Sequence, residues 1–180
     1  MSFFVPPDND ALREKWADSP QHGGTCGVSC IAALERTSVQ SVIDRWAGES
    51  WPGYSPMRGM VSTLKALGYS VERRRGMKAK EFPLSQKVLE GGAAIVRIQW
   101  LDDDGKDYSG FMERARHTHY VLMQEFPESN ILDGSGKTIH VDQGVYVFCN
   151  GEAGWFKAYG RYALRYLQPG YISSYLEVSK

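Results

Sequence analysis

The chain contains few cysteines and no long apolar run. Its three cysteines, Cys26, Cys30 and Cys149, are odd in number and irregular in spacing, which argues against a framework of disulfide bonds. No second pair of cysteines or histidines follows at the spacing of a zinc site, so we predict no metal ion, and no motif indicates a cofactor. No segment approaches ~18 consecutive apolar residues, so we expect no transmembrane helix and no insertion into a membrane.

An excess of charge is also absent, because 21 lysines and arginines balance 21 aspartates and glutamates. This balance argues against nucleic acid as a partner. The opening segment MSFFVPPDND lacks the basic stretch and apolar run of a secretory signal. We therefore expect a cytoplasmic protein, with export by a route that leaves no signal in the chain, or delivery by a phage, as alternatives.

The chain has 180 residues, of which 42% are apolar and 23% charged, which is typical of a soluble globular protein. This length suffices for one domain with a hydrophobic core and is short for two. We predict a single domain over residues 1–180, with residues 1–20 as an N-terminal extension and a core over about 20–168. The sequence does not specify an oligomeric state.

Apolar residues recur at helical spacing in the first part of the chain. They predict a short helix near residues 8–16, a helix from Cys26 to about Arg36, a second short helix opened by a serine, and a third helix that ends at Gly68. The residues predicted to cap the last three helices are Thr25, Ser38 and Ser55.

The second part of the chain is rich in β-branched residues and turn signals. It predicts strands at 69–75, 93–100, 119–123, 130–133, 137–141 and 145–148. A hairpin-like turn is expected between the last two. Residues 82–89 form a short helix or turn, 101–110 form a polar loop, and the segment around 160–166 is a candidate closing strand. Helices that precede strands indicate an α+β fold, with N-terminal helices packed on an antiparallel β-sheet.

Cys26 is a candidate nucleophile because it stands at the start of the first strong helix. Unpaired backbone N–H groups and the helix dipole favour a thiolate at that position. Glycines precede it, and we expect Gly27 to allow a substrate backbone to approach closely. Cys30 lies one turn further on, near the apolar face, and is predicted to be a buried core thiol.

A nucleophilic cysteine needs a base, an orienting group and donors for an oxyanion. His119 begins an apolar strand and is the first candidate base, with His117 as the second. Asp133 is the candidate orienting group, since a hairpin between the strands 119–123 and 130–133 would bring its carboxylate beside His119. The Cys26 N–H and the Gln21 side-chain amide are the candidate oxyanion donors.

These segments also carry a resemblance to a known family. The segment QHGGTCGVSCIAA (21–33) resembles the Gln…CysGly…Ala segment of papain-like cysteine peptidases. The resemblance is strongest to the bacterial branch that cleaves double-glycine leader peptides during bacteriocin export. HYVLM (119–123) and ILDGS (131–135) resemble the histidine and aspartate segments of that branch. SPMRGMVSTLKALGY (55–69) and GGAAIVRI (91–98) resemble its intervening helix and next strand. The chain departs from the pattern where Gly134 replaces a proline, and in the spacing of Gln21 from Cys26.

The resemblance implies a papain-like fold and a Cys26–His119–Asp133 triad with Gln21 at the oxyanion. The expected activity is cleavage of a peptide or isopeptide bond in a protein or peptide substrate. Two alternatives remain open. One is a toxin or effector that uses the same residues for deamidation, acyl transfer or cell-wall amidase chemistry. The other is a non-catalytic binding or inhibitor protein on the same fold.

Overall fold

The computed structural model describes residues 25–48, 50–77, 93–107, 109–110, 118–126, 129–132, 138–141, 144–149, 154–157 and 170–180. Several predictions lie outside these residues: the helix at 8–16, the element at 82–89, the segment at 160–166, and the candidate site residues Gln21, His117 and Asp133. The division of the chain into a single domain stays a prediction.

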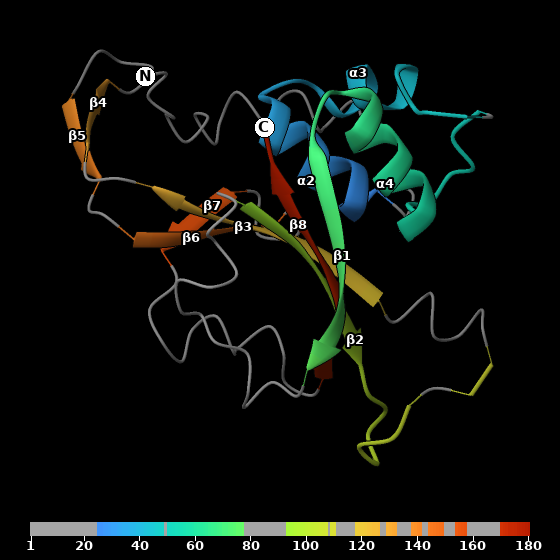
Figure 1. Ribbon diagram of the computed structural model, residues 1–180. Coiled ribbons are helices and arrows are strands. Elements are labelled where there is room, and N and C mark those ends of the chain that lie inside the picture. The colour runs from blue at the N-terminus through green and yellow to red at the C-terminus, as the bar shows by residue number, and fades with distance from the viewer. Residues whose placement is uncertain are drawn as a thin grey trace.

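A six-stranded antiparallel sheet forms the base of the described structure (Figure 1). Its strands lie in the order β1, β8, β2, β3, β6, β7. Their bounds are Ser70–Met77 for β1, Gly170–Ser179 for β8, Ala93–Trp100 for β2, Thr118–Phe126 for β3, Gly144–Cys149 for β6 and Gly154–Lys157 for β7. Strands β4 (Ser129–Leu132) and β5 (Thr138–Val141) pair with each other in a separate two-stranded sheet.

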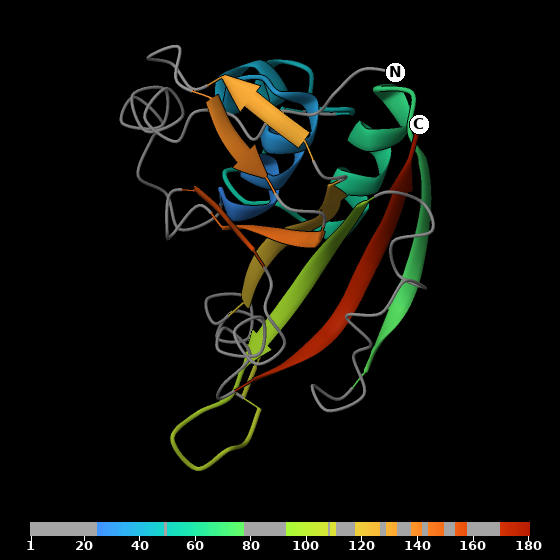
Figure 2. The same cartoon turned by 90° about the vertical axis from the view of Figure 1, so that its left-hand side faces the viewer.

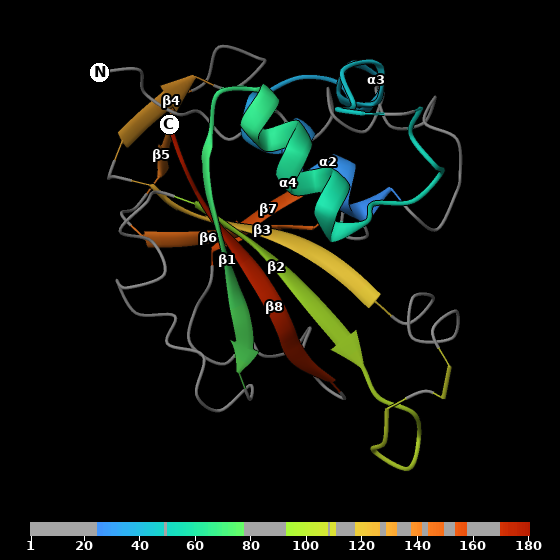
Figure 3. The ribbon, with the colours of Figure 1, turned by 45° about the vertical axis from the view of Figure 1, so that its right-hand side comes forward.

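Helices lie on one face of the large sheet, at one end of its long strands (Figure 3). Helix α2 (Cys26–Glu35) packs directly on β3, and helices α3 (Val39–Asp44) and α4 (Met57–Ala66) pack on α2. The view turned by 90° shows β1, β8 and β2 curving away below this helical layer (Figure 2). The predicted α+β class, with N-terminal helices on an antiparallel sheet, is therefore confirmed.

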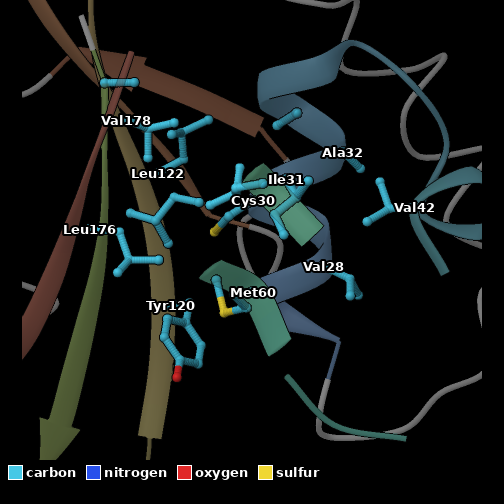
Figure 4. Packing of buried hydrophobic residues seen from close by; sticks show 14 of the residues in the cluster. Val28, Cys30, Ile31, Ala32, Val42, Met60, Tyr120, Leu122, Leu176 and Val178 are labelled. Carbon is cyan, nitrogen blue, oxygen red and sulfur yellow. The ribbon is translucent and has the colours of Figure 1, made fainter. Parts of the chain in front are cut away.

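The main hydrophobic core lies between α2 and the sheet (Figure 4). Val28, Ile31 and Met60 of the helices belong to the same fully buried cluster as Ile95 and Leu122 of the central strands. The other face of β2 and β3 is buried as well, at Ala94, Val96, Val121 and Met123. Because both faces are covered, β2 reads as the nearly continuous apolar run AAIVRIQW in the sequence.

Most of the predicted elements agree with the structure, and the N-cap of α3 is confirmed because the Ser38 hydroxyl accepts the Ser41 N–H at 3.1 Å. Thr25 is the N-cap residue of α2, as predicted, although its side chain makes no capping hydrogen bond. The predicted cap of α4 is wrong, because the N-cap residue of this helix is Pro56, which has no side-chain acceptor. The Ser55 hydroxyl instead accepts a hydrogen bond from the Val28 N–H at 3.1 Å. It therefore caps the start of α2, although it stands just before α4 in the chain.

The predicted hairpin between the strands at 137–141 and 145–148 is also wrong. Strand β5 pairs with β4, whereas β6 pairs with β3 and β7 in the large sheet. Consecutive strands here belong to different sheets, which local turn signals cannot reveal. The sequence also gave no sign of β8, the strand that lies between β1 and β2.

Candidate active site

Cys26 is the first residue of α2 and is partly exposed, whereas Cys30 on the next turn is 1% exposed. Both are present as thiols. The predicted core position of Cys30 is therefore confirmed. The first turn of α2 is fixed by Ser55, which uses the Val28 N–H, one of the N–H groups that a helix leaves without a partner inside its own backbone.

Gly27 is needed for packing inside the protein. A Cβ atom at this position would lie 2.4 Å from Ser55 Cβ and 2.7 Å from Met60 Sδ. Gly27 is buried, and the segment that leads into α4 occupies the space where a side chain of this residue would lie. The expectation that Gly27 admits a substrate backbone is wrong, because the missing side chain makes room for Ser55.

Tyr120 is the residue of β3 that interacts with the start of α2. It is 6% exposed, and its phenol interacts electrostatically with both Cys26 and Cys30. Burial raises the pKa of Tyr120 to about 12, and the nearby positive charge of Arg97 acts in the opposite direction. Figure 4 shows its hydroxyl pointing away from the labelled apolar side chains of the core. Tyr120 is thus a neutral hydroxyl beside the thiols at ordinary pH.

His119 lies on the other face of the sheet. Neighbouring residues of a strand point to opposite faces, and Tyr120 and Leu122 belong to the core beneath α2. The His119 ring instead stacks on the ring of Trp100, with centroids 5.6 Å apart and planes 8° from parallel. Burial lowers the pKa of His119 below 6.5, so the imidazole is neutral at pH 7. The described arrangement therefore brings Tyr120, and not His119, to the α2 side of the sheet.

The edge of β3 near His119 is open to one side among the described strands. His119 pairs with Ile98 of β2, whereas the pairing of β3 with β6 begins only at Leu122. The predicted hairpin that would carry Asp133 next to His119 is wrong, since β4 pairs with β5 and the sheet neighbours of β3 are β2 and β6.

A polar network that the sequence analysis did not identify lies on the α2-facing side of β2 and β3. The Arg97 guanidinium donates to Ser173 Oγ at 3.1 Å and to Thr118 Oγ1 at 3.2 Å. Thr118 Oγ1 in turn donates to the Oε1 atom of Gln99, also at 3.2 Å. Gln99 is only 3% exposed. The one available signal was an arginine and a glutamine inside an otherwise apolar strand.

Within the described ranges, no group of three or more histidine, cysteine, aspartate or glutamate residues is arranged to hold a metal ion. None of the helices described has the length and apolar character needed to cross a membrane.

Comparison with solved structures gives a distant structural likeness. No family profile matches the sequence, and no curated protein matches it. Among solved structures, the peptidase domain of Streptococcus ComA, described as a bi-functional ABC transporter involved in a quorum sensing pathway, aligns with 86% of this chain and 90% of its own. The two are 10% identical and the TM-score is 0.41, so no conclusion about activity follows from the likeness.

Proposed function

We propose that the chain is a cysteine-dependent hydrolase that cleaves a peptide or isopeptide bond, with Cys26 as its nucleophile. The observation that carries this proposal is the position of Cys26 at the first residue of α2, partly exposed, on a helix that is otherwise anchored in the core. The N-terminal end of a helix favours a thiolate through its N–H groups and dipole. Cys30 lacks this position and is enclosed by apolar side chains.

His119 is the proposed base. Its lowered pKa supports this role, because an imidazole that stays neutral at pH 7 is able to accept the thiol proton. For the pair to form, the ring has to leave Trp100 and reach the α2 side of the sheet around the edge of β3 that no described strand pairs with near His119. Catalytic hydrogen bonds are often long or poorly aligned before substrate binds, so the geometry without substrate does not by itself rule out His119 as the base.

The remaining steps follow the chemistry of acyl transfer. The Cys26 thiolate attacks the carbonyl carbon, and the Cys26 N–H with the Gln21 amide stabilises the oxyanion. The imidazolium, oriented by Asp133, gives its proton to the leaving amine. Water then hydrolyses the thioester with His119 again as base. In this proposal Gln21, His119 and Asp133 keep the roles expected from the sequence.

Alkylation of the folded protein tests the nucleophile. The protein is treated briefly with iodoacetamide, and the modified cysteines are identified by peptide mass mapping. We expect Cys26 to react well before Cys30, and the Cys26→Ser variant to lose the fast phase. We expect His119→Gln to lower turnover of a cleavable peptide by on the order of 100-fold or more. Equal rates at Cys26 and Cys30 would show that Cys26 is not the nucleophile.

A second candidate is a binding protein without catalytic activity, and the position of the His119 ring on the face opposite Tyr120 favours it. In that case Cys26→Ala leaves the biological effect intact. Deamidation, acyl transfer and amidase chemistry would use the same nucleophile. Release of ammonia from a glutamine peptide without chain cleavage distinguishes deamidation from proteolysis.

A further inference from the structure

Arg97 carries a positive charge that no carboxylate neutralises within the described residues. The guanidinium donates hydrogen bonds to the neutral hydroxyls of Ser173 and Thr118, and it also interacts with the neutral phenol of Tyr120. The side chain is also partly withdrawn from solvent, in the middle of β2. A guanidinium has five N–H donors in a planar fork that matches a carboxylate, so donors remain for a further partner.

The hydroxyls that hold Arg97 are fixed as acceptors. Ser173 Oγ donates its own hydrogen to the Arg97 carbonyl oxygen at 3.2 Å, and Thr118 Oγ1 donates to Gln99. Each hydroxyl therefore presents a lone pair to the guanidinium. Gln99 is buried, and its side-chain amide donates to the Trp100 carbonyl oxygen at 3.3 Å. The backbone of β2 therefore fixes the Gln99 side chain, which in turn orients the Thr118 hydroxyl. The guanidinium is thus held in place before any ligand arrives.

An irregularity in the sheet builds this arrangement. The register between β2 and β8 shifts between Arg97 and Ile98: Arg97 pairs with Ser174, but Ile98 pairs with Ile172. Ser173 is the extra residue of a β-bulge, a feature that often redirects a side chain near an active site. Without the bulge, Ser173 would point away from the face that Ser174 and Leu176 share with Arg97.

Tyr120 connects Arg97 to the candidate nucleophile. Arg97 and Tyr120 are directly paired across β2 and β3. The Tyr120 phenol interacts with the Arg97 guanidinium and also with Cys26. The charge of Arg97 therefore lies on the same side of the sheet as the start of α2, and Tyr120 interacts with both Arg97 and Cys26.

We propose that Arg97, held by Ser173 and Thr118, binds a carboxylate of the substrate next to Cys26. This inference rests on the proposed function, in which Cys26 attacks the substrate. The chemistry fits a peptide with an acidic side chain or a free C-terminal carboxylate close to the reacting carbonyl. Arg97 contributes recognition of the substrate and takes no part in proton transfer.

Alkylating probes that carry or lack a carboxylate test the proposal. N-iodoacetyl-glycine is compared with N-iodoacetyl-glycinamide, which differs only in its terminal charge. N-iodoacetyl-glutamate α-amide is compared with the corresponding glutamine compound. This second pair tests whether the carboxylate that binds Arg97 belongs to an acidic side chain. In each reaction the Cys26 sulfur forms a bond to carbon, iodide leaves, and the thiol proton passes to solvent.

We expect the carboxylate probe of one pair to alkylate Cys26 roughly tenfold faster than its amide, the size of effect that one hydrogen bond to a charged group confers. Arg97→Gln should abolish this preference, which is judged as the ratio of the carboxylate rate to the amide rate within that variant. Arg73→Gln removes an exposed arginine from edge strand β1 and is the matched control, so it should keep the preference. The pair that shows the preference identifies the source of the carboxylate.

Two results would overturn the proposal: equal rates within both pairs in the wild type, or a preference that persists in Arg97→Gln. If Arg97→Gln does not fold, the wild-type preference is measured against salt, and a preference that does not fall with ionic strength excludes the role. The nucleophile is judged separately, by whether the neutral amides modify Cys26 faster than Cys30. A slow reaction with the amides contradicts the proposed function, while the ratio within each pair still decides the role of Arg97.

Discussion

The imidazole of His119 lies flat against the indole of Trp100, with ring centroids 5.6 Å apart. The two residues come from adjacent strands and share the sheet face away from α2. This stack holds the proposed base in a buried, neutral state on the side opposite Tyr120. The indole of Trp100 therefore covers one face of the imidazole on the side of the sheet away from α2.

Replacing Trp100 by alanine should expose the His119 ring. Because burial is the cause of the lowered pKa, we expect the pKa of His119 to rise toward its ordinary value of 6.5 in Trp100→Ala. The measurement is an NMR titration of the imidazole protons in both proteins, with His119→Gln to assign the signals. A wild-type His119 that titrates at or above 6.5 contradicts the buried stack.

Tyr120 should make the protein sensitive to alkali. Its pKa in the folded protein is about 12, above the ordinary value of 10, so the unfolded chain loses this proton first as the pH rises. The contribution to stability is complete below pH 10 and is lost between about 10 and 12. We expect Tyr120→Phe to unfold at a higher pH than the wild type, as measured by circular dichroism at fixed temperature. An unchanged alkaline midpoint would show that this phenol is not buried.

Gly27→Ala should destabilise the fold. The added Cβ would meet Ser55 Cβ at 2.4 Å and Met60 Sδ at 2.7 Å, closer than atoms in proteins approach. Overpacking of a core by a methyl group costs about 1–3 kcal/mol. The free energy of unfolding in urea measures the effect. Ser62→Ala, at an exposed position of α4, is the control and should change stability little. An unaffected Gly27→Ala variant would mean that α2 and the 55–60 segment are further apart than described.

Ser55→Ala should leave the Val28 N–H without its acceptor at the buried start of α2. Removal of one partner from a buried hydrogen bond costs about 1–3 kcal/mol. We expect faster hydrogen exchange at the Val28 amide, while the Tyr69 amide, which donates to Leu64 O beyond the end of α4, keeps its protection. Equal changes at both amides would indicate a global loss of stability and would contradict a local role for Ser55.

The sequence was sufficient to predict elements whose signals are local. The bounds of β2 agree with its run of β-branched residues, and α2 begins at the cysteine that the glycine-rich turn marks. Such local signals could not predict which strands pair with each other across long stretches of the chain. Strand β8 and the separation of β5 from β6 are set by contacts between residues far apart in the chain.

The candidate site was predictable only in part, for a physical reason. Alternate residues of a strand point to opposite faces, and usually only the set that faces the core is apolar. In β3 both sets are buried, at Val121, Leu122 and Met123. The apolar run HYVLM therefore does not reveal whether His119 or Tyr120 faces α2. Arg97 was missed because its partner Ser173 reaches it through a bulge, which has no marker in either strand.

The position of β8 between β1 and β2 has a consequence for how the chain is made. Ser70 pairs with Ser179, and Ala93 pairs with Val178, whereas β1 and β2 are not paired with each other. During translation the ribosome therefore releases both flanking strands long before the strand that joins them. The large sheet is completed only after residues 170–179 have left the exit tunnel, and until then the inner edge of β2 is exposed to other partners, including chaperones.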